Sequence, residues 1–166
     1  RANPAAGTVS AFGETHAASF GKGGFCPAAD KREGDGKTPL GLWPIRAALL
    51  RPDRLPPPKT ALPWRWLRPW DGWSDGAADP AYNRPVTIQH PHSHESLWRD
   101  DHAYDLILVL AHNDSPPIPG LGSAIFWHVC QPDGRPTEGC VAMERDALAR
   151  WLDTMALGDA VAISVD

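Results

Sequence analysis

The chain has 166 residues and a formal net charge of −4, with 16 basic and 20 acidic side chains. One hydrophobic core serves about 100 to 200 residues, so this length predicts a single domain over residues 1–166. The acidic balance without clustered Lys and Arg argues against a nucleic-acid partner, and no apolar run approaches the ~18 residues of a transmembrane helix.

Turn-forming residues and indole rings dominate the composition. The chain has 18 prolines, 15 glycines and 8 tryptophans. Proline and glycine stay below the ~25–30% at which low complexity becomes the default, so we expect loops rather than disorder. The chain begins at Arg1 without a basic-then-apolar leader, which leaves open whether a signal peptide was removed or the chain was trimmed.

The N-terminal part predicts strands separated by a polar loop. Residues 8–12 are typical of a short strand, and residues 40–45 of a strand interrupted at Gly41 and ended at Pro44. The loop at residues 30–39 contains glycines that permit positive φ, but these glycines and Lys37 lack the spacing of a phosphate-binding loop.

Residues 51–79 form a proline-rich insertion with four tryptophans, Trp64, Trp66, Trp70 and Trp73. Proline is excluded from helix interiors and most ladder positions, so we expect an irregular segment on the surface. Its rings either wall a substrate cleft or fasten the loop to the core. We expect deletion of this insertion to impair substrate use more than folding.

The second half predicts more strands than helices. Strands are expected at residues 85–90, 104–111, 123–129, 140–143 and 160–165, and the continuous apolar run at 104–111 indicates burial on both faces. A short helix is expected over 93–99 with Ser93 as its cap, and a longer one over 144–155, before Gly158. Together these elements predict a mainly β fold with a few short helices and long loops.

His128 and Cys140 are the residues most suited to chemistry. A turn at residues 132–135 separates them, so a strand that bears the histidine would fold back to bring the thiol beside it. A thiolate is a nucleophile, and an adjacent imidazole takes its proton. Gly139 permits a tight turn whose backbone N–H groups stabilise an oxyanion.

Two other interpretations of these residues stay open. Cys140 is a buried structural cysteine in the first, because cysteine is among the most buried residue types. Cys130 is the reactive thiol in the second, because it lies two residues from His128 and on the same strand face if the strand continues. Cys26, Cys130 and Cys140 are too few for a disulfide framework.

A histidine cluster raises the question of a metal site. His90, His92 and His94 alternate, so an extended segment would project them from one face, with Glu95, His102 or His112 as further ligands. Pro91 interrupts this segment and no H-E-x-x-H element is present, so we expect no metal.

Residues 122–128 (GSAIFWH) and 137–143 (TEGCVAM) resemble the catalytic core of the YkuD-type L,D-transpeptidases, in which a strand histidine precedes a Ser/Thr-His-Gly-Cys-aliphatic-Arg/Asn signature. Residues 31–41 (KREGDGKTPLG) are similar to that family's loop ending in Thr-Pro-x-Gly. Glu138, Ala142 and Val129 depart from the signature, and the spacing from His128 to Cys140 is shorter than is common. These departures indicate a divergent branch, and acceptor recognition does not carry over to Glu138 or Ala142.

The resemblance implies a YkuD-like β-sandwich catalytic domain that needs no cofactor. Cys140 would be the nucleophile and His128 the base, with backbone amides around Gly139 as oxyanion donors. The thiolate would attack the carbonyl of an L-residue joined to a D-residue in a peptidoglycan stem peptide. An amine of diaminopimelate on a second stem would then resolve the thioester and form a cross-link.

The resemblance also implies a periplasmic place in cell-wall biogenesis and cell shape, with the signal peptide absent from this chain. Water in place of the amine would give an L,D-carboxypeptidase, and a cysteine amidase or a non-catalytic peptidoglycan-binding module are further alternatives. We expect a monomer. The candidate substrate-binding residues are Thr137, Arg99, Tyr104, His112, Asn113 and Trp73, with Tyr82 and Asn83 as weaker candidates.

Overall fold

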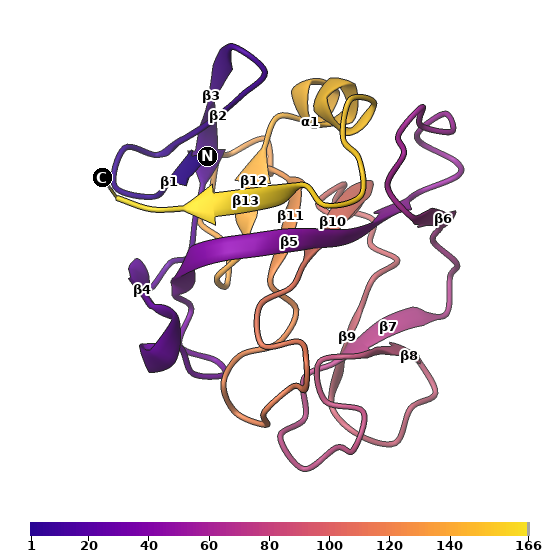
Figure 1. Ribbon diagram of the computed structural model, residues 1–166. Coiled ribbons are helices and arrows are strands. Elements are labelled where there is room, and N and C mark those ends of the chain that lie inside the picture. Colours follow the sequence, from indigo (N-terminus) through magenta and orange to yellow (C-terminus); the bar gives the residue numbers. More distant parts are fainter. Residues whose placement is uncertain (166) are drawn as a thin grey trace.

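The computed structural model describes residues 1–165 and has a mainly β fold (Figure 1). This confirms the fold class expected from the sequence. The one α-helix in this range is α1 (Arg145–Leu152), and η1 (Ala28–Asp30) is a 3-10 helix. The strands are β1 (Ala2–Asn3), β2 (Thr8–Ala11), β3 (Glu14–Ser19), β4 (Phe25–Pro27), β5 (Thr38–Leu50), β6 (Trp64–Trp66), β7 (Asp71–Ser74), β8 (Pro85–Thr87), β9 (His94–Ser96), β10 (Leu106–Leu110), β11 (Phe126–Val129), β12 (Val141–Met143) and β13 (Ala160–Ile163).

The main sheet closes on itself. Its order is β10-β11-β12-β3-β2-β1-β13-β5-β4, and β10 pairs with β5 again while β6 also joins β5. The first part of β5, residues 41–44, pairs with β13, whereas residues 45–50 pair with β10. In the same way β3 pairs first with β2 and then with β12. The two shared strands therefore join two layers of a sandwich around one core.

The strand β10 is buried on both faces, as its apolar run predicts. Leu106, Leu108 and Leu110 face the interior of the sandwich, where they pack with residues of β11, β12, β13 and α1. Ile107 and Val109 face the other way, into a second apolar cluster. The outer face of the layer formed by β10, β11 and β12 is therefore covered as well.

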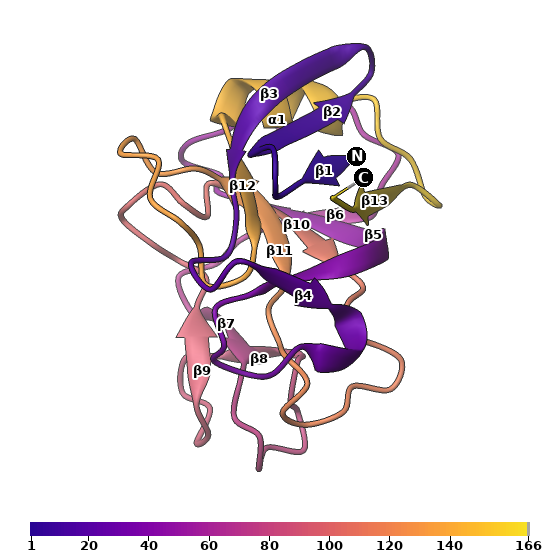
Figure 2. The same cartoon turned by 90° about the vertical axis from the view of Figure 1, so that its left-hand side faces the viewer.

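A smaller sheet supplies this cover. Its three strands are ordered β8-β7-β9, and it lies below the main sheet in Figures 1 and 2. Trp73 of β7 stands edge-on against Phe126 of β11, with ring centroids 5.2 Å apart, and Leu97 after β9 is fully buried in the same cluster. The two sheets are thus packed together around Phe126.

Helix α1 begins within one residue of the expected start and is shorter than expected. The Glu144 carboxylate accepts hydrogen bonds from the backbone N–H groups of Asp146 and Ala147, which satisfies donors at the helix start. Ala147, Leu148, Trp151 and Leu152 form its buried face. No helix within residues 1–165 is long and apolar enough to cross a membrane.

Three expectations about individual elements are wrong. Residues 93–99 form no helix, because residues 94–96 pair with β7 instead. The strand at 40–45 does not end at Pro44 but continues to Leu50, because pairing with β13 and then β10 holds it extended. The insertion at 51–79 is not an irregular surface segment, since it contains β6 and β7 and buries Leu62, Leu67 and Trp73.

Candidate active site

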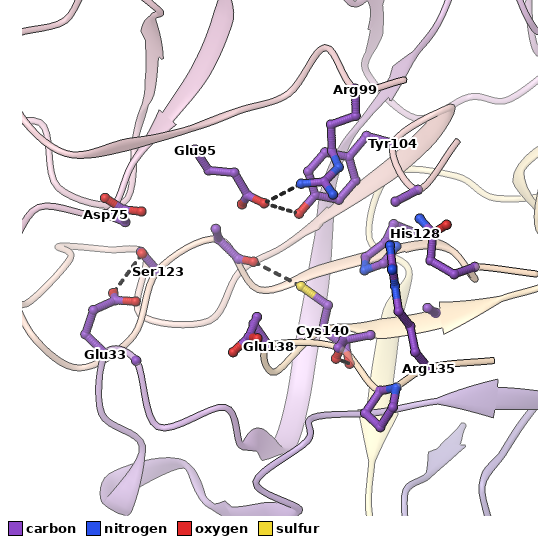
Figure 3. Close-up of a pocket in the computed structure, with 17 residues that line it drawn as sticks. Glu33, Asp75, Glu95, Arg99, Tyr104, Ser123, His128, Arg135, Glu138 and Cys140 are labelled. Atoms are coloured by element: carbon purple, nitrogen blue, oxygen red, sulfur yellow. Dashed lines mark hydrogen bonds and ion pairs between the residues drawn. The ribbon is translucent and has the colours of Figure 1, made fainter. Parts of the chain in front are cut away.

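A cavity of about 630 Å³ lies where the small sheet meets the ends of β11 and β12. Figure 3 shows the side chains that line it. His128 and Cys140 are among them, together with Arg99, Tyr104 and Thr137. The structure therefore brings five of the residues singled out in the sequence to the wall of one cavity.

His128 and Cys140 lie on the same face of two adjacent strands. Strands β11 and β12 are parallel, with His128 opposite Ala142, so the chain does not fold back at residues 132–135 as the sequence predicts but returns through a longer loop to run in the same direction. Cys140 immediately precedes β12 and is two residues from Ala142, so its side chain projects on the same side as the imidazole. The thiol and the imidazole are diagonal neighbours that open into the same cavity.

The thiol of Cys140 is protonated in the resting site. Its Sγ donates to the carbonyl oxygen of Ala124 at 3.2 Å and accepts from the backbone N–H of Phe126 at 3.4 Å. No hydrogen bond joins Sγ to His128 within residues 1–165, and in Figure 3 the dashed line from the Cys140 sulfur leads away from His128. Burial raises the pKa of the thiol to about 12, so the neutral form dominates at pH 7.

His128 is held as a neutral imidazole. Its Nδ1 lies 2.9 Å from the carbonyl oxygen of Val129, an acceptor, so this nitrogen carries the proton and Nε2 is left with a lone pair. Only 7% of the residue is exposed, and burial lowers its pKa to about 4. The residue therefore has the tautomer and the charge that a general base needs.

The loop before Cys140 is fixed by a threonine and a glycine. The Thr137 hydroxyl donates to the carbonyl oxygen of Cys140 at 2.8 Å and accepts from the N–H of Gly139 at 3.2 Å. Gly139 has φ +129°, and a Cβ there would lie 2.7 Å from the carbonyl oxygen of Lys37. Only glycine fits this position, so the loop keeps one shape around the nucleophile.

A network of charged and hydrogen-bonded side chains forms the cavity wall beside His128. The Arg99 guanidinium donates two hydrogen bonds to Asp101, at 3.0 and 2.5 Å, which lower the pKa of that carboxyl to about 2. Arg99 also lies over the ring of Tyr104 at 5.2 Å. The Tyr104 hydroxyl donates to Glu95 at 2.7 Å, and burial raises the pKa of Glu95.

Three of the six main substrate-binding candidates, Trp73, His112 and Asn113, lie outside the cavity wall, as do the weaker candidates Tyr82 and Asn83. Trp73 packs on Phe126 and donates from Nε1 to Asn83. His112 contacts the carbonyl oxygen of Leu121, and the Asn113 amide bonds the backbone of residues 118 and 122. These side chains support the loop that leads into β11, and substrate contact by them stays a prediction.

The other cysteines and the histidine cluster are also placed apart from the cavity. Cys130 follows the end of β11 and donates its backbone N–H to Met143. His90 Nε2 lies 2.5 Å from an Asp79 carboxylate oxygen. Within residues 1–165, no group of three or more His, Cys, Asp or Glu side chains is arranged to hold a metal ion.

The sequence reasoning missed several polar residues of the cavity wall. Glu33, Asp75, Ser123 and Gln131 line it, and each comes from a different part of the chain. Glu33 lies in the loop at residues 31–41 and Ser123 in the segment at residues 122–128, and both segments carry the family resemblance. Asp75 and Gln131 lie in no motif, and they reach the cavity only because the two sheets pack together.

Comparison with known protein families gives a match that covers nearly the whole chain. Residues 8–163 match the family model YkuD, described as the L,D-transpeptidase catalytic domain. Searches of the curated proteins and of the solved structures find no significant match to the chain.

Proposed function

We propose that this chain, which belongs to the YkuD family of L,D-transpeptidase catalytic domains, cross-links peptidoglycan stem peptides through a thioester on Cys140. The family acts on peptidoglycan stem peptides, and its members are usually exported cell-wall enzymes. The observation that carries the proposal is the placement of Cys140 and His128 on one face of β11 and β12, both open to one cavity.

Acylation begins with a proton transfer inside the cavity. The thiol turns from Ala124 O toward His128, and Nε2 takes its proton while Sγ bonds to the carbonyl carbon of the L-residue. With pKa values of about 12 for the thiol and about 4 for the imidazole, a resting ion pair is disfavoured. The thiolate therefore forms as it attacks, which keeps the free enzyme unreactive.

The backbone at Cys140 supports the tetrahedral intermediate. The N–H of Cys140 donates to no acceptor within residues 1–165, so it is free to bind the oxyanion. The imidazolium then gives its proton to the departing nitrogen of the D-side fragment, and a thioester remains. An amine of a second stem attacks the thioester, gives its proton to Nε2 and restores the thiol.

Water that attacks the same thioester gives L,D-carboxypeptidase activity, which uses the same residues. The balance depends on how well the cavity excludes water. A cysteine amidase would also use this site, with a different scissile bond. The mass of the acyl group on the enzyme identifies the bond that is cut, since cleavage after L-alanine and cleavage after diaminopimelate leave different fragments.

A non-catalytic wall-binding module receives less support from the tryptophans. Trp64 and Trp66 pack edge-to-face on each other at 5.1 Å, and Trp73 is buried. Trp70 is the exception, with 47% of its surface exposed. The four rings therefore form no common exposed surface on which sugars would stack.

Intact-protein mass spectrometry after incubation with a disaccharide-tetrapeptide donor tests the proposal. We expect an acyl adduct on the wild-type protein that disappears in Cys140→Ala and persists in Cys130→Ala. An adduct that persists in Cys140→Ala and disappears in Cys130→Ala would move the nucleophile to Cys130. Binding to sacculi without any adduct would favour the wall-binding module.

A further inference from the structure

Two carboxylates line the cavity on one side of Cys140, and two arginines line it on the other. Figure 3 shows Glu33 and Asp75 at one end, Arg135 and His128 at the other, and Cys140 between them. The acidic end is formed by the loop before β5 and the residue after β7. The basic end is formed by the segments that follow β9 and β11.

The acidic end holds two carboxylates without a counter-ion. Within residues 1–165, neither Glu33 nor Asp75 has a Lys, Arg or His nitrogen within salt-bridge distance. Glu33 accepts hydrogen bonds from Tyr82 and Ser123 on one oxygen, Oε2, at 2.5 and 2.7 Å. The Asp75 Oδ1 atom is buried and has no hydrogen-bond partner. A buried carboxylate oxygen of this kind favours a cationic partner.

The basic end contains two arginines and two carboxylates, and one of the arginines is only weakly paired. Arg99 and Arg135 share Asp101, at 2.5 and 3.4 Å, and Glu95 lies 3.8 Å from Arg99 while it also binds the Tyr104 hydroxyl. Among residues 1–165, the Arg135 side chain has one partner, the long contact to Asp101. Gln131 lines the same cavity, and its side-chain nitrogen is buried without an acceptor among residues 1–165. An arginine and an unpaired amide donor together suit a carboxylate.

We infer that Glu33 and Asp75 bind the ammonium group of the acceptor stem and that one of these carboxylates takes a proton from it, which leaves the neutral amine that attacks the thioester, whereas Gln131 and Arg135 bind a carboxylate of the donor stem. The inference rests on the proposed function and adds to it the side of the cavity from which each stem enters. Each transfer reaction needs one acyl group and one amine at Cys140, so the two stems enter the cavity from opposite sides of the sulfur. The unpaired oxygen of Asp75 and the unpaired nitrogen of Gln131 are then both satisfied by substrate.

The partition of the acyl-enzyme between amine and water tests the acidic end. The donor is a disaccharide-tetrapeptide and the acceptor a tripeptide stem that carries diaminopimelate. We expect Glu33→Gln and Asp75→Asn each to lower the ratio of cross-linked to hydrolysed product about tenfold, since a hydrogen bond to a charged group is worth that or more. The ratio is measured after acylation, so a slower first step does not affect it.

Two further variants serve as controls. Glu138→Gln changes a carboxylate at the rim that is exposed and paired with Lys22 at 2.7 Å, and we expect the ratio to stay within twofold of wild type. Arg135→Gln acts on the donor side, so we expect acylation to slow about tenfold while the ratio is kept. Glu33→Gln alters the hydrogen bonds that Glu33 accepts from Tyr82 and Ser123, so a folding defect in this variant is conceivable. Asp75 takes no part in those bonds, so Asp75→Asn tests the acidic end without that defect.

The possible outcomes distinguish a failure of this inference from a failure of the proposed function. An acyl-enzyme that forms normally but whose ratio is unchanged in both acidic variants overturns the inference alone. An equal fall in Glu138→Gln also overturns it, because a general charge effect would then explain the data. A wild-type protein that forms no acyl-enzyme overturns the proposed function and the inference together.

Discussion

The phenol ring of Tyr104 stands edge-on against the imidazole of His128, with ring centroids 5.2 Å apart and an interplanar angle of 85°. Tyr104 precedes β10 of the main sheet, and its hydroxyl donates to Glu95 of β9 in the small sheet. The small sheet thereby helps to orient the imidazole beside Cys140. The folded arrangement of the two sheets and the geometry of the base are coupled through one ring.

Removal of this ring should slow acylation and change its pH dependence. We expect Tyr104→Ala to lower the acylation rate constant at least about tenfold, because the imidazole loses its wall and water enters. Solvation would also raise the pKa of His128 from about 4 toward its ordinary value, so the acid limb of the rate profile moves up in pH. Tyr104→Phe keeps the ring and should stay within a few-fold. An equal loss in both variants would assign the effect to the hydroxyl.

His128 should make the protein sensitive to mild acid. Its pKa is about 4 in the folded protein and near 6.5 in an unfolded chain, so the unfolded state binds the proton first as pH falls. The contribution is absent above pH 6.5 and grows to a loss of about 2 to 3 kcal/mol of unfolding free energy near pH 4. Urea unfolding at pH 7 and pH 4.5 measures this loss.

The matched variant for this measurement is His128→Gln, which cannot be protonated. We expect it to lose less stability than wild type between the two pH values, by about 2 kcal/mol. Burial lowers the pKa of His112 as well, but this residue is present in both proteins, so the difference isolates His128. Equal losses in the two proteins would mean that His128 titrates normally.

The Thr137 hydroxyl should matter more for acylation than for folding. Thr137→Val removes its hydrogen bonds to Cys140 O and Gly139 N with little change of volume, at a cost of about 1 kcal/mol of stability or somewhat more. The loop before Cys140 then loses its fixed shape, so we expect the acylation rate to fall at least about tenfold. Thr137→Ser keeps the hydroxyl and should restore most of the rate. A Val variant that acylates at the wild-type rate would contradict this role.

The sequence was most informative where the relevant contact is local. The sequence correctly placed His128 and Cys140 side by side but not the way they meet, because the loop at residues 130–140 joins two parallel strands instead of folding the chain back; the burial of β10 follows from its own apolar run. The sequence predicts too short a strand for β5, because Gly41 and Pro44 are residue types that usually interrupt or end a strand. Pairing with β13 and β10 on its two halves overrides those signals, and no local pattern records such pairing.

The rest of the cavity could not be predicted for a related reason. Glu33, Asp75 and Gln131 are polar residues in three separate segments, and only the segment of Glu33 carries a recognisable pattern. They become a site only when the small sheet docks on β10 and β11. The helix expected at residues 93–99 fails for the same cause, since the edge of β7 offers a strand partner that outweighs the capping signal at Ser93.

The tryptophans of the insertion should divide into a structural and an exposed class. Trp73 is buried against Phe126, and its Nε1 donates to Asn83 at 2.9 Å, whereas Trp70 is 47% exposed. We expect Trp73→Ala to lower the unfolding free energy by about 3 to 5 kcal/mol, because a large buried side chain leaves a cavity. Trp70→Ala should change it by less than about 0.5 kcal/mol. Urea unfolding of the two variants gives both values.

The same pair of variants decides what the insertion at 51–79 does. Typical domains are stable by only about 5 to 15 kcal/mol, so the loss expected at Trp73, added to that of buried Leu62 and Leu67, makes deletion of the insertion unfold the protein. This reverses the expectation from the sequence, in which deletion impairs substrate use more than folding. A Trp73→Ala protein that is as stable as wild type but fails to acylate would restore it, because the ring would then serve the substrate rather than the core.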